Sequence, residues 1–127
     1  MRSSLYIALA IAGCSLAACS KEKGATSRDG VVAAWKKGGL EPSALTAAKT
    51  EVGSDCASGT VNKIDVLVCT FKSAQDAKAA EEKGLVWVGD NTGASKAQGE
   101  ILIVVADRKK VDPHGKILNQ LVTLPAQ

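Results

Sequence analysis

The sequence has few aromatic residues and almost no histidine. Its 127 residues include two Trp, one Tyr, one Phe and one His. Proteins that bind single-stranded nucleic acid stack bases on aromatic side chains and gather basic residues on one surface. Here the formal net charge is only +3, and the lysines are interspersed with acidic residues. We therefore expect no nucleic-acid partner.

Patterns typical of nucleotide, metal and catalytic sites are also missing. Neither GxGxxG nor GxxxxGK[ST] occurs in the sequence. The single histidine, His114, lacks the further His or Cys ligands of a zinc site, and Asp107 and Asp112 do not have calcium-loop spacing. As a catalytic base His114 would need a nucleophile and an orienting group, and we favour a solvated position for it. We expect no metal, no cofactor and no enzymatic activity.

No apolar run reaches the roughly 20 residues that a membrane-spanning helix needs. A shorter run over 5–13 follows Arg2 and precedes a series of small residues. A basic start, a short apolar run and a small-residue exit are the parts of a secretory signal peptide. Residues 1–18 are therefore predicted to be a signal peptide and are set apart from the fold.

Leu16-Ala17-Ala18-Cys19 resembles the lipobox of bacterial lipoprotein precursors, and the resemblance covers about 20 residues. In that family the chain is cut just before the Cys, whose thiol carries diacylglycerol, and the new amine is often acylated. The resemblance implies lipidation at Cys19 and anchoring in the cell envelope. Because Ser20 rather than Asp follows, it further implies the periplasmic face of the outer membrane.

A second box, Ile11-Ala12-Gly13-Cys14, competes for the cut. Cutting there would leave an apolar run of only about seven residues, at the lower limit for a signal peptide, and would leave Cys19 unexplained. Cutting at Cys19 instead leaves an even pair, Cys56 and Cys69. We therefore expect an acylated Cys19 and a short polar tether over 19–26, followed by one domain over 27–127.

Helix signals occur at three places in this domain. Capping-box spacing begins at Thr26 and at Ser73, and Gly38 and Gly84 supply C-terminal stops. Asp112-Pro113 has the residues of a helix start. These signals predict helices over 27–37 and 73–83 and a last helix from 112, with Ile117, Leu118, Leu121 and Leu124 on one face.

Strand signals lie between these helices. The segment 64–71 is rich in β-branched residues. If Asn62-Lys63 form a two-residue turn, paired positions sum to 125 and Cys56 faces Cys69. The remaining predicted strands cover 45–52, 85–89 and 101–106, and 90–99 is predicted to be a long polar turn.

These elements predict an α+β fold in the order α-β-β-α-β-β-α. We expect a two-layer sandwich in which helices pack on one face of a mostly antiparallel four-stranded sheet.

The cysteine pair has a structural and a chemical interpretation. In an exported protein, cysteines on facing strands favour a structural disulfide between Cys56 and Cys69. A redox-active dithiol is the alternative, but such pairs usually lie two residues apart at a helix N-terminus. Here thirteen positions separate the two cysteines, so we favour the structural disulfide.

Four residues are candidates for an interaction site. Trp87, on the predicted strand, either packs in the core or is exposed as a hot-spot residue. Asp90 and Asn91 open the predicted turn, which is either a plain loop or a backbone cradle for an anion. Arg108 belongs to a charged run that is either a solvated loop or a protein-binding edge.

Together these features predict a non-enzymatic, lipid-anchored envelope protein. Its expected role is interaction with another envelope protein near the membrane. The alternative is a lipoprotein that binds a small ligand or an anion through the 90–99 segment and the sheet face. An enzyme built around His114 or the cysteine pair ranks last.

Overall fold

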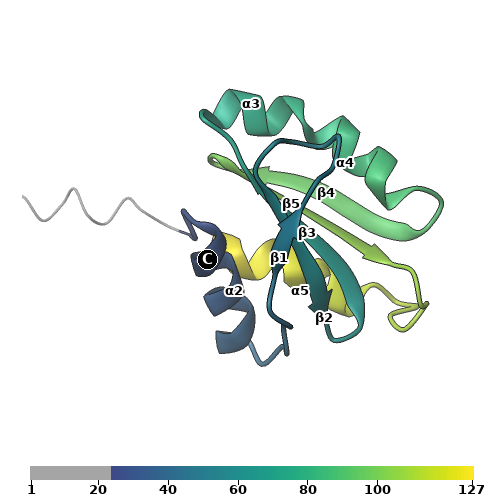
Figure 1. Cartoon of the computed structure of the whole chain (residues 1–127). Helices are drawn as coiled ribbons and strands as arrows, with labels where there is room; N and C mark the ends of the chain where they lie inside the picture. The colour runs from purple at the N-terminus through teal and green to yellow at the C-terminus, as the bar shows by residue number, and fades with distance from the viewer. Residues whose placement is uncertain (1–23) are drawn as a thin grey trace, which may run out of the picture.

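The computed structural model describes residues 24–127 (Figure 1). The predicted signal peptide (1–18), Cys19 and the tether as far as Lys23 lie outside the described residues. The elements in chain order are α2 (Arg28–Lys37), β1 (Thr46–Ala48), β2 (Cys56–Val61), β3 (Ile64–Thr70), α3 (Ala74–Ala79), α4 (Glu81–Val88), β4 (Thr92–Gln98), β5 (Ile101–Asp107), α5 (Lys116–Thr123) and the short 3-10 helix η1 (Leu124–Ala126).

The strands form one antiparallel sheet in the order β1-β2-β3-β5-β4, against which the helices pack. The predicted α+β class is therefore confirmed. Three features of the predicted architecture are wrong. The sheet has five strands rather than four, and helices cover both of its faces rather than one. The element order is α-β-β-β-α-α-β-β-α rather than α-β-β-α-β-β-α. The inner strand β5, between β3 and β4, is buried along its whole length, because its apolar side chains pack on both faces of the sheet.

The first face of the sheet, covered by α2 and α5, holds the larger side chains. Trp35 of α2 is fully buried there, and its indole Nε1–H donates a hydrogen bond to the Leu121 carbonyl oxygen of α5 at 2.8 Å. One polar contact thus joins the two helices over the core. The buried residues of this face are Val31, Trp35, Leu40, Val61, Ile64, Val66, Val68, Ile101, Ile103, Val105, Leu118 and Leu121.

The second face, covered by α3 and α4, is built from smaller side chains. A Cβ added to Gly84 of α4 would lie 2.9 Å from the Ser95 Cβ of β4, so helix and strand are already in contact. On the strand side, a Cβ at Gly93 would meet Val88 of α4 at 2.8 Å. The buried residues of this face are Val52, Cys56, Leu67, Cys69, Ala80, Val88, Leu102, Val104 and Ala106.

The predicted hairpin at Asn62–Lys63 is confirmed. Both residues have positive φ, 50° and 72°, as a type I′ turn requires in a twisted hairpin. The strands pair from Val61 with Ile64 to Cys56 with Cys69, which is the predicted register. The Asn62 side-chain oxygen also accepts a hydrogen bond from the Glu41 backbone N–H at 2.8 Å, which holds the turn against the preceding loop.

The region 73–99 differs most from the prediction. Ser73 caps α3 as expected, but the chain does not stop at Gly84: after a break at Ala80 it continues as α4 to Val88. The predicted strand over 85–89 is therefore helix, and the predicted turn over 90–99 is mostly strand β4. Gly84 does not end a helix but lies within α4. The absence of a side chain at this position allows α4 to lie against Ser95.

The remaining predicted elements are present, but two of them differ from the prediction in their bounds. The helix over 27–37 is confirmed as α2, with the Ser27 hydroxyl accepting from the Gly30 N–H. The strand predicted over 45–52 is only the three residues of β1. The last helix begins at Lys116 rather than at Asp112, whose carboxylate instead accepts a hydrogen bond from the Leu118 N–H at 2.8 Å.

Candidate functional site

The sheet has two ends with different neighbours. At the terminal end, the Ala25 N–H donates to the Pro125 carbonyl oxygen at 2.7 Å, and Gln98 Nε2 donates to the carbonyl oxygens of both residues. Figure 1 shows the marked C-terminus beside the start of α2. At the far end lie the end of α4, the start of β4 and the loop after β5. The six residue steps of β5 separate the two ends by roughly 20 Å.

Arg108 is the centre of the polar contacts at the far end. Its Nε lies 3.0 Å from Asp65 Oδ2, and its guanidinium carbon lies 4.5 Å from the centre of the Trp87 ring. Its terminal nitrogens donate to the carbonyl oxygens of Trp87 at 2.9 Å and Val88 at 3.4 Å. A cation is favourable at these carbonyls because they end helix α4. Arg108 therefore holds α4, β3 and the loop after β5 together.

The candidates from the sequence gather around this arginine. Trp87 lies half-buried in the last turn of α4 rather than on a strand. Asn91 donates from Nδ2 to the Val88 carbonyl oxygen at 2.9 Å, and Asp90 beside it is exposed. Asp65 was missed, although the predicted β2–β3 register already placed it near the turn end of the hairpin.

Exposed apolar side chains flank the cluster. Val86 is 80% exposed and Leu85 53% exposed, both on α4 next to Trp87. In the loop after β5, Val111 is 39% exposed. The far end thus combines a Trp–Arg pair with exposed apolar side chains, a composition typical of binding hot spots.

The loop after β5, residues 108–115, is held by two buried carboxylates. Asp107 is 4% exposed and accepts from the backbone N–H groups of Val111 and Asp112, each at 2.9 Å. Asp112 is 6% exposed and accepts from the Leu118 N–H. Within the loop Lys110 has a positive φ of 56°, which favours Asn or Gly in other proteins. The loop is therefore a fixed structure rather than a flexible link.

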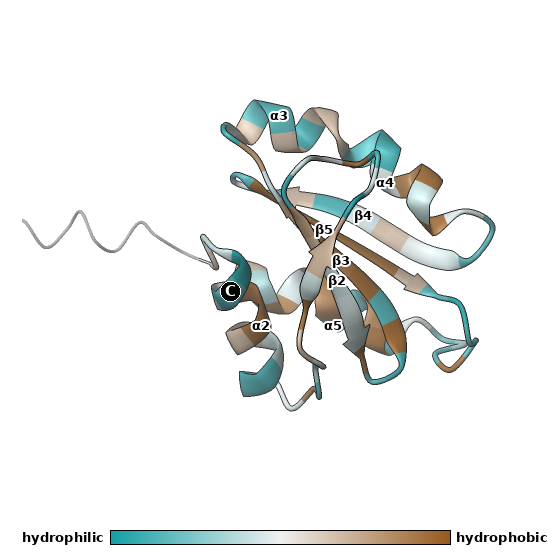
Figure 2. Ribbon diagram, viewed as in Figure 1, coloured by the Kyte–Doolittle hydropathy of each residue, from teal (hydrophilic) through white to brown (hydrophobic). Residues whose placement is uncertain are grey.

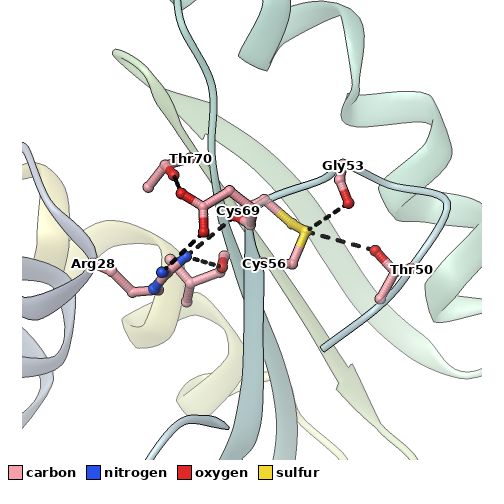
Figure 3. A network of polar contacts seen from close by, with 8 residues as sticks. Arg28, Thr50, Gly53, Cys56, Cys69 and Thr70 are labelled. Atoms are coloured by element: carbon pink, nitrogen blue, oxygen red, sulfur yellow. Dashed lines mark hydrogen bonds and ion pairs between the residues drawn. A yellow bond between two sulfur atoms is a disulfide. The ribbon is translucent and has the colours of Figure 1, made fainter. Parts of the chain in front are cut away.

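The cysteine pair lies near the terminal end. Cys56 and Cys69 form the predicted disulfide, and both are buried (Figure 3). The Thr50 hydroxyl donates to the Cys56 sulfur at 3.6 Å. The two cysteines are 3% and 0% exposed, so a reactant would have little access to the sulfur atoms. This burial is typical of a structural disulfide.

An ion pair lies beside this disulfide (Figure 3). Arg28 of α2 contacts Asp55 Oδ1 at 3.2 Å and also donates to the Val68 carbonyl oxygen of β3 at 3.3 Å. The hydrogen bond from the Thr70 hydroxyl, together with the Arg28 guanidinium, holds the pKa of the Asp55 carboxyl below its ordinary value. This network ties α2 to the β2–β3 hairpin.

A groove of about 690 Å³ runs between α2 and the segment that leads into β1. Its wall combines apolar side chains with the charged groups of α2. The lining includes Arg28, Val32, Lys36, Pro42, Leu45 and Ala57. The size is within the range of small-molecule sites, roughly 300–1,000 Å³.

His114 is exposed in the loop before α5 and takes part in none of these contacts. Across residues 24–127 no group of three or more His, Cys, Asp or Glu side chains could hold a metal ion. In the same residues, no helix has both the length and the apolar character to cross a membrane. Comparison with protein-family models, curated proteins and solved structures gives no match to this chain.

Proposed function

We propose that this chain is a lipid-anchored envelope protein that binds a protein partner through the far end of its sheet. In this proposal residues 1–18 are removed and Cys19 is acylated. The domain is then held at the periplasmic face of the outer membrane. Acyl chains supply about 0.8 kcal/mol per buried methylene, so two or three chains hold a protein firmly in a bilayer.

The observation that carries the proposal is the distance between the tether and the Arg108 cluster. Ala25 is fixed to Pro125 and Gln98 at the terminal end. The six residue steps from Cys19 to Ala25 reach at most about 20 Å. An anchored domain would therefore keep its terminal end near the bilayer and direct the far end away from it.

The chemistry of the far end supports a protein partner. Trp87 and Arg108 belong to residue types enriched in binding hot spots. Arg108 and Asp65 already fix the Trp87 ring in place, which reduces the ordering cost of association. Leu85 and Val86 add apolar surface that would be covered on binding.

Photo-crosslinking in cells tests the proposal. A photoreactive residue at Val86, in the exposed part of α4, should capture a protein in the wild-type background and not with Cys19→Ala. The same residue at Ala79, exposed on α3 and closer to the terminal end, is the matched control. Equal adducts at the two positions, or the same adduct with Cys19→Ala, would contradict the proposal. Intact-mass measurement of the mature chain checks the lipid on Cys19 separately.

A small-ligand function is the second candidate, and the α2 groove favours it. The 90–99 segment no longer supports that function, because its residues form strand β4. The groove offers Arg28, Lys36, Asp29 and Asp55 beside apolar side chains, which suits a small amphipathic ligand with charges of both signs. Native mass spectrometry of the purified chain distinguishes the two functions, because only the second expects a bound small molecule that Val32→Trp displaces.

A further inference from the structure

The far end also carries a basic surface, which is separate from the Arg108 cluster. We call it the lysine loop: Lys63 of the β2–β3 turn, Lys109 and Lys110 of the loop after β5, and Lys116 at the start of α5. All four side chains are exposed. A shallow groove of about 450 Å³ lies among them, and its lining includes Lys63, Val111 and Ile117.

Three acidic residues near the lysine loop already have hydrogen-bond or ion-pair partners. Asp107 and Asp112 are buried and accept hydrogen bonds from the backbone. Asp65 is paired with Arg108. In the part of the chain that the structure describes, no ion pair includes a residue of the lysine loop. Among residues 24–127, Glu41 in the wall of the groove and Asp90 before β4 are the exposed acidic residues at this end.

The terminal end carries charges of both signs, because exposed lysines (Lys49, Lys72 and Lys83) lie among its exposed carboxylates. Exposed acidic residues lie in the first turn of α2, the loop before β2, the start of α3 and the β4–β5 turn: Asp29, Glu51, Asp76 and Glu100. Anionic lipid headgroups attract basic segments, and this mixed end attracts them less than an uninterrupted group of lysines does. The basic surface faces the opposite direction, about 20 Å further along the sheet.

The lysine loop is also preorganised. The Asp107 carboxylate fixes the backbone of residues 111 and 112, and the positive φ of Lys110 is maintained within this arrangement. Rigid loops lose less conformational entropy on binding than flexible loops do. The backbone that carries Lys109, Lys110 and Val111 is thus held in a defined geometry beside the groove.

We propose that the lysine loop binds an acidic, partly apolar segment of a protein partner. This inference rests on the proposed function, because it names the partner chemistry of the same end of the domain. Carboxylates of the segment would pair with Lys63, Lys109 and Lys110, and an apolar side chain would lie on Val111 in the groove. Complementary charge of this kind directs encounter and register.

Peptide binding to the full chain in detergent micelles tests the inference. The probe is a fluorescein-labelled peptide of alternating Glu and Leu, and a Gln–Leu peptide is the neutral comparison. Lys109→Ala with Lys110→Asn removes two charges, and Asn tolerates the positive φ at 110. Lys37→Asn with Lys49→Ala removes the same charge from the exposed end of α2 and the loop after β1 and is the matched control, named the α2 control.

The Glu–Leu peptide should bind the wild type and the α2 control within about twofold of each other, and the loop variant about tenfold more weakly. Val111→Ser should weaken binding without changing its dependence on salt. Unchanged circular dichroism of each variant excludes unfolding as the cause.

Three results would overturn the inference. They are absence of binding by the wild type, equal weakening in the α2 control, and binding of the neutral peptide as strong as that of the acidic one. Displacement of the peptide by soluble dihexanoylphosphatidylglycerol, but not by its phosphocholine counterpart, would assign the loop to lipid and also overturn it. A lipidated Cys19 with a Val86 adduct but no peptide binding refutes this inference alone, whereas an unmodified Cys19 refutes the proposed function.

Discussion

The two faces of the sheet reach the same degree of burial by different means. On the first face, large side chains such as Trp35, Ile64 and Leu121 fill the space between the sheet and the helices α2 and α5. On the second face, α4 lies directly against β4 through Gly84 and Ser95. In Figure 2, β3 and β5, which contribute to both faces, are mostly brown, whereas β4, which lies against α4, is paler.

This contrast indicates where stability depends on volume and where it depends on distance. Filling a core with large side chains makes deletion costly, because a cavity remains. Bringing a helix directly onto a strand makes addition costly, because neither backbone can move aside easily. The first face should therefore be sensitive to smaller residues and the second face to larger ones.

Trp35→Ala should have the largest effect, because it breaks the first face. The substitution leaves a cavity and removes the donor to the Leu121 carbonyl oxygen, and we expect a loss of about 3–5 kcal/mol in the free energy of unfolding. Trp35→Phe keeps most of the volume and should cost about 1–3 kcal/mol, mainly for the unpaired carbonyl. Urea denaturation of the purified chain measures both. Equal losses for Phe and Ala would show that volume is not what matters at this position.

Removing the disulfide should have the next largest effect, because it releases the second face at the β2–β3 hairpin. Cys56→Ala with Cys69→Ala opens a loop of 14 residues, for which chain entropy predicts a loss of about 3 kcal/mol. The comparison is the wild type unfolded with and without reductant. If reduction leaves the unfolding midpoint unchanged, the second face is stable without this bond.

Gly84→Ala should cost about 1–3 kcal/mol by forcing α4 away from β4. The added Cβ would lie 2.0 Å from Ser95 Oγ and 2.9 Å from Val104 Cγ2. Ser95→Gly in the same chain should recover part of the loss, because it removes the first contact and leaves the second. Ser95→Ala alone should be neutral or stabilising, since the Ser95 hydroxyl is buried and has no hydrogen-bond partner in residues 24–127. Additive effects of Gly84→Ala and Ser95→Gly would contradict this account of the contact.

Asp55→Asn should have the smallest effect, and the effect should depend on pH. The Thr70 hydroxyl and the Arg28 guanidinium lower the pKa of the Asp55 carboxyl in the folded chain. A lowered folded pKa contributes stability above the unfolded value of about 3.9, and this contribution is lost as the pH falls through the folded pKa. The wild type should therefore exceed Asp55→Asn in melting temperature at pH 7, and the difference should disappear in acid. A difference that is constant from pH 7 to strongly acidic solution would contradict this assignment.

The same contrast explains which elements could be predicted from the sequence. α2, β3, β5 and the turn at Asn62–Lys63 were predicted correctly, because caps, β-branched runs and turn residues act locally. These elements also contribute most of the large residues of the first face. Their hydrophobic periodicity therefore reports directly on what they bury.

The second face was predicted poorly for a physical reason. β4 contains Gly93, Ser95 and Ala97, whose small size is needed beneath α4 but leaves no apolar alternation in the sequence. Conversely, Leu85 and Val86 are apolar but exposed on α4, which made this helix resemble a strand. Only the three-dimensional contact between α4 and β4 shows which small residues are structural.

The candidate site was predicted only in part. Trp87, Asn91 and Arg108 were identified individually, and the structure brings them together although they lie on α4, before β4 and after β5. Their grouping depends on α4 being a helix, since only its C-terminal carbonyls give Arg108 and Asn91 a common set of acceptors. The pairing of Arg108 with Asp65 needed the β3–β5 register, which no local pattern specifies.

The contacts among Ala25, Gln98 and Pro125 also determine how the domain would bear a mechanical load. A pull on the chain before Ala25 reaches the Ala25–Pro125 hydrogen bond and the Gln98 side chain before it reaches α2. Such a load would therefore act on η1 and the end of β4 before it acts on the first turn of α2. If the domain is anchored as proposed, a pull from the bilayer would break the contacts of this junction before those of the opposite end.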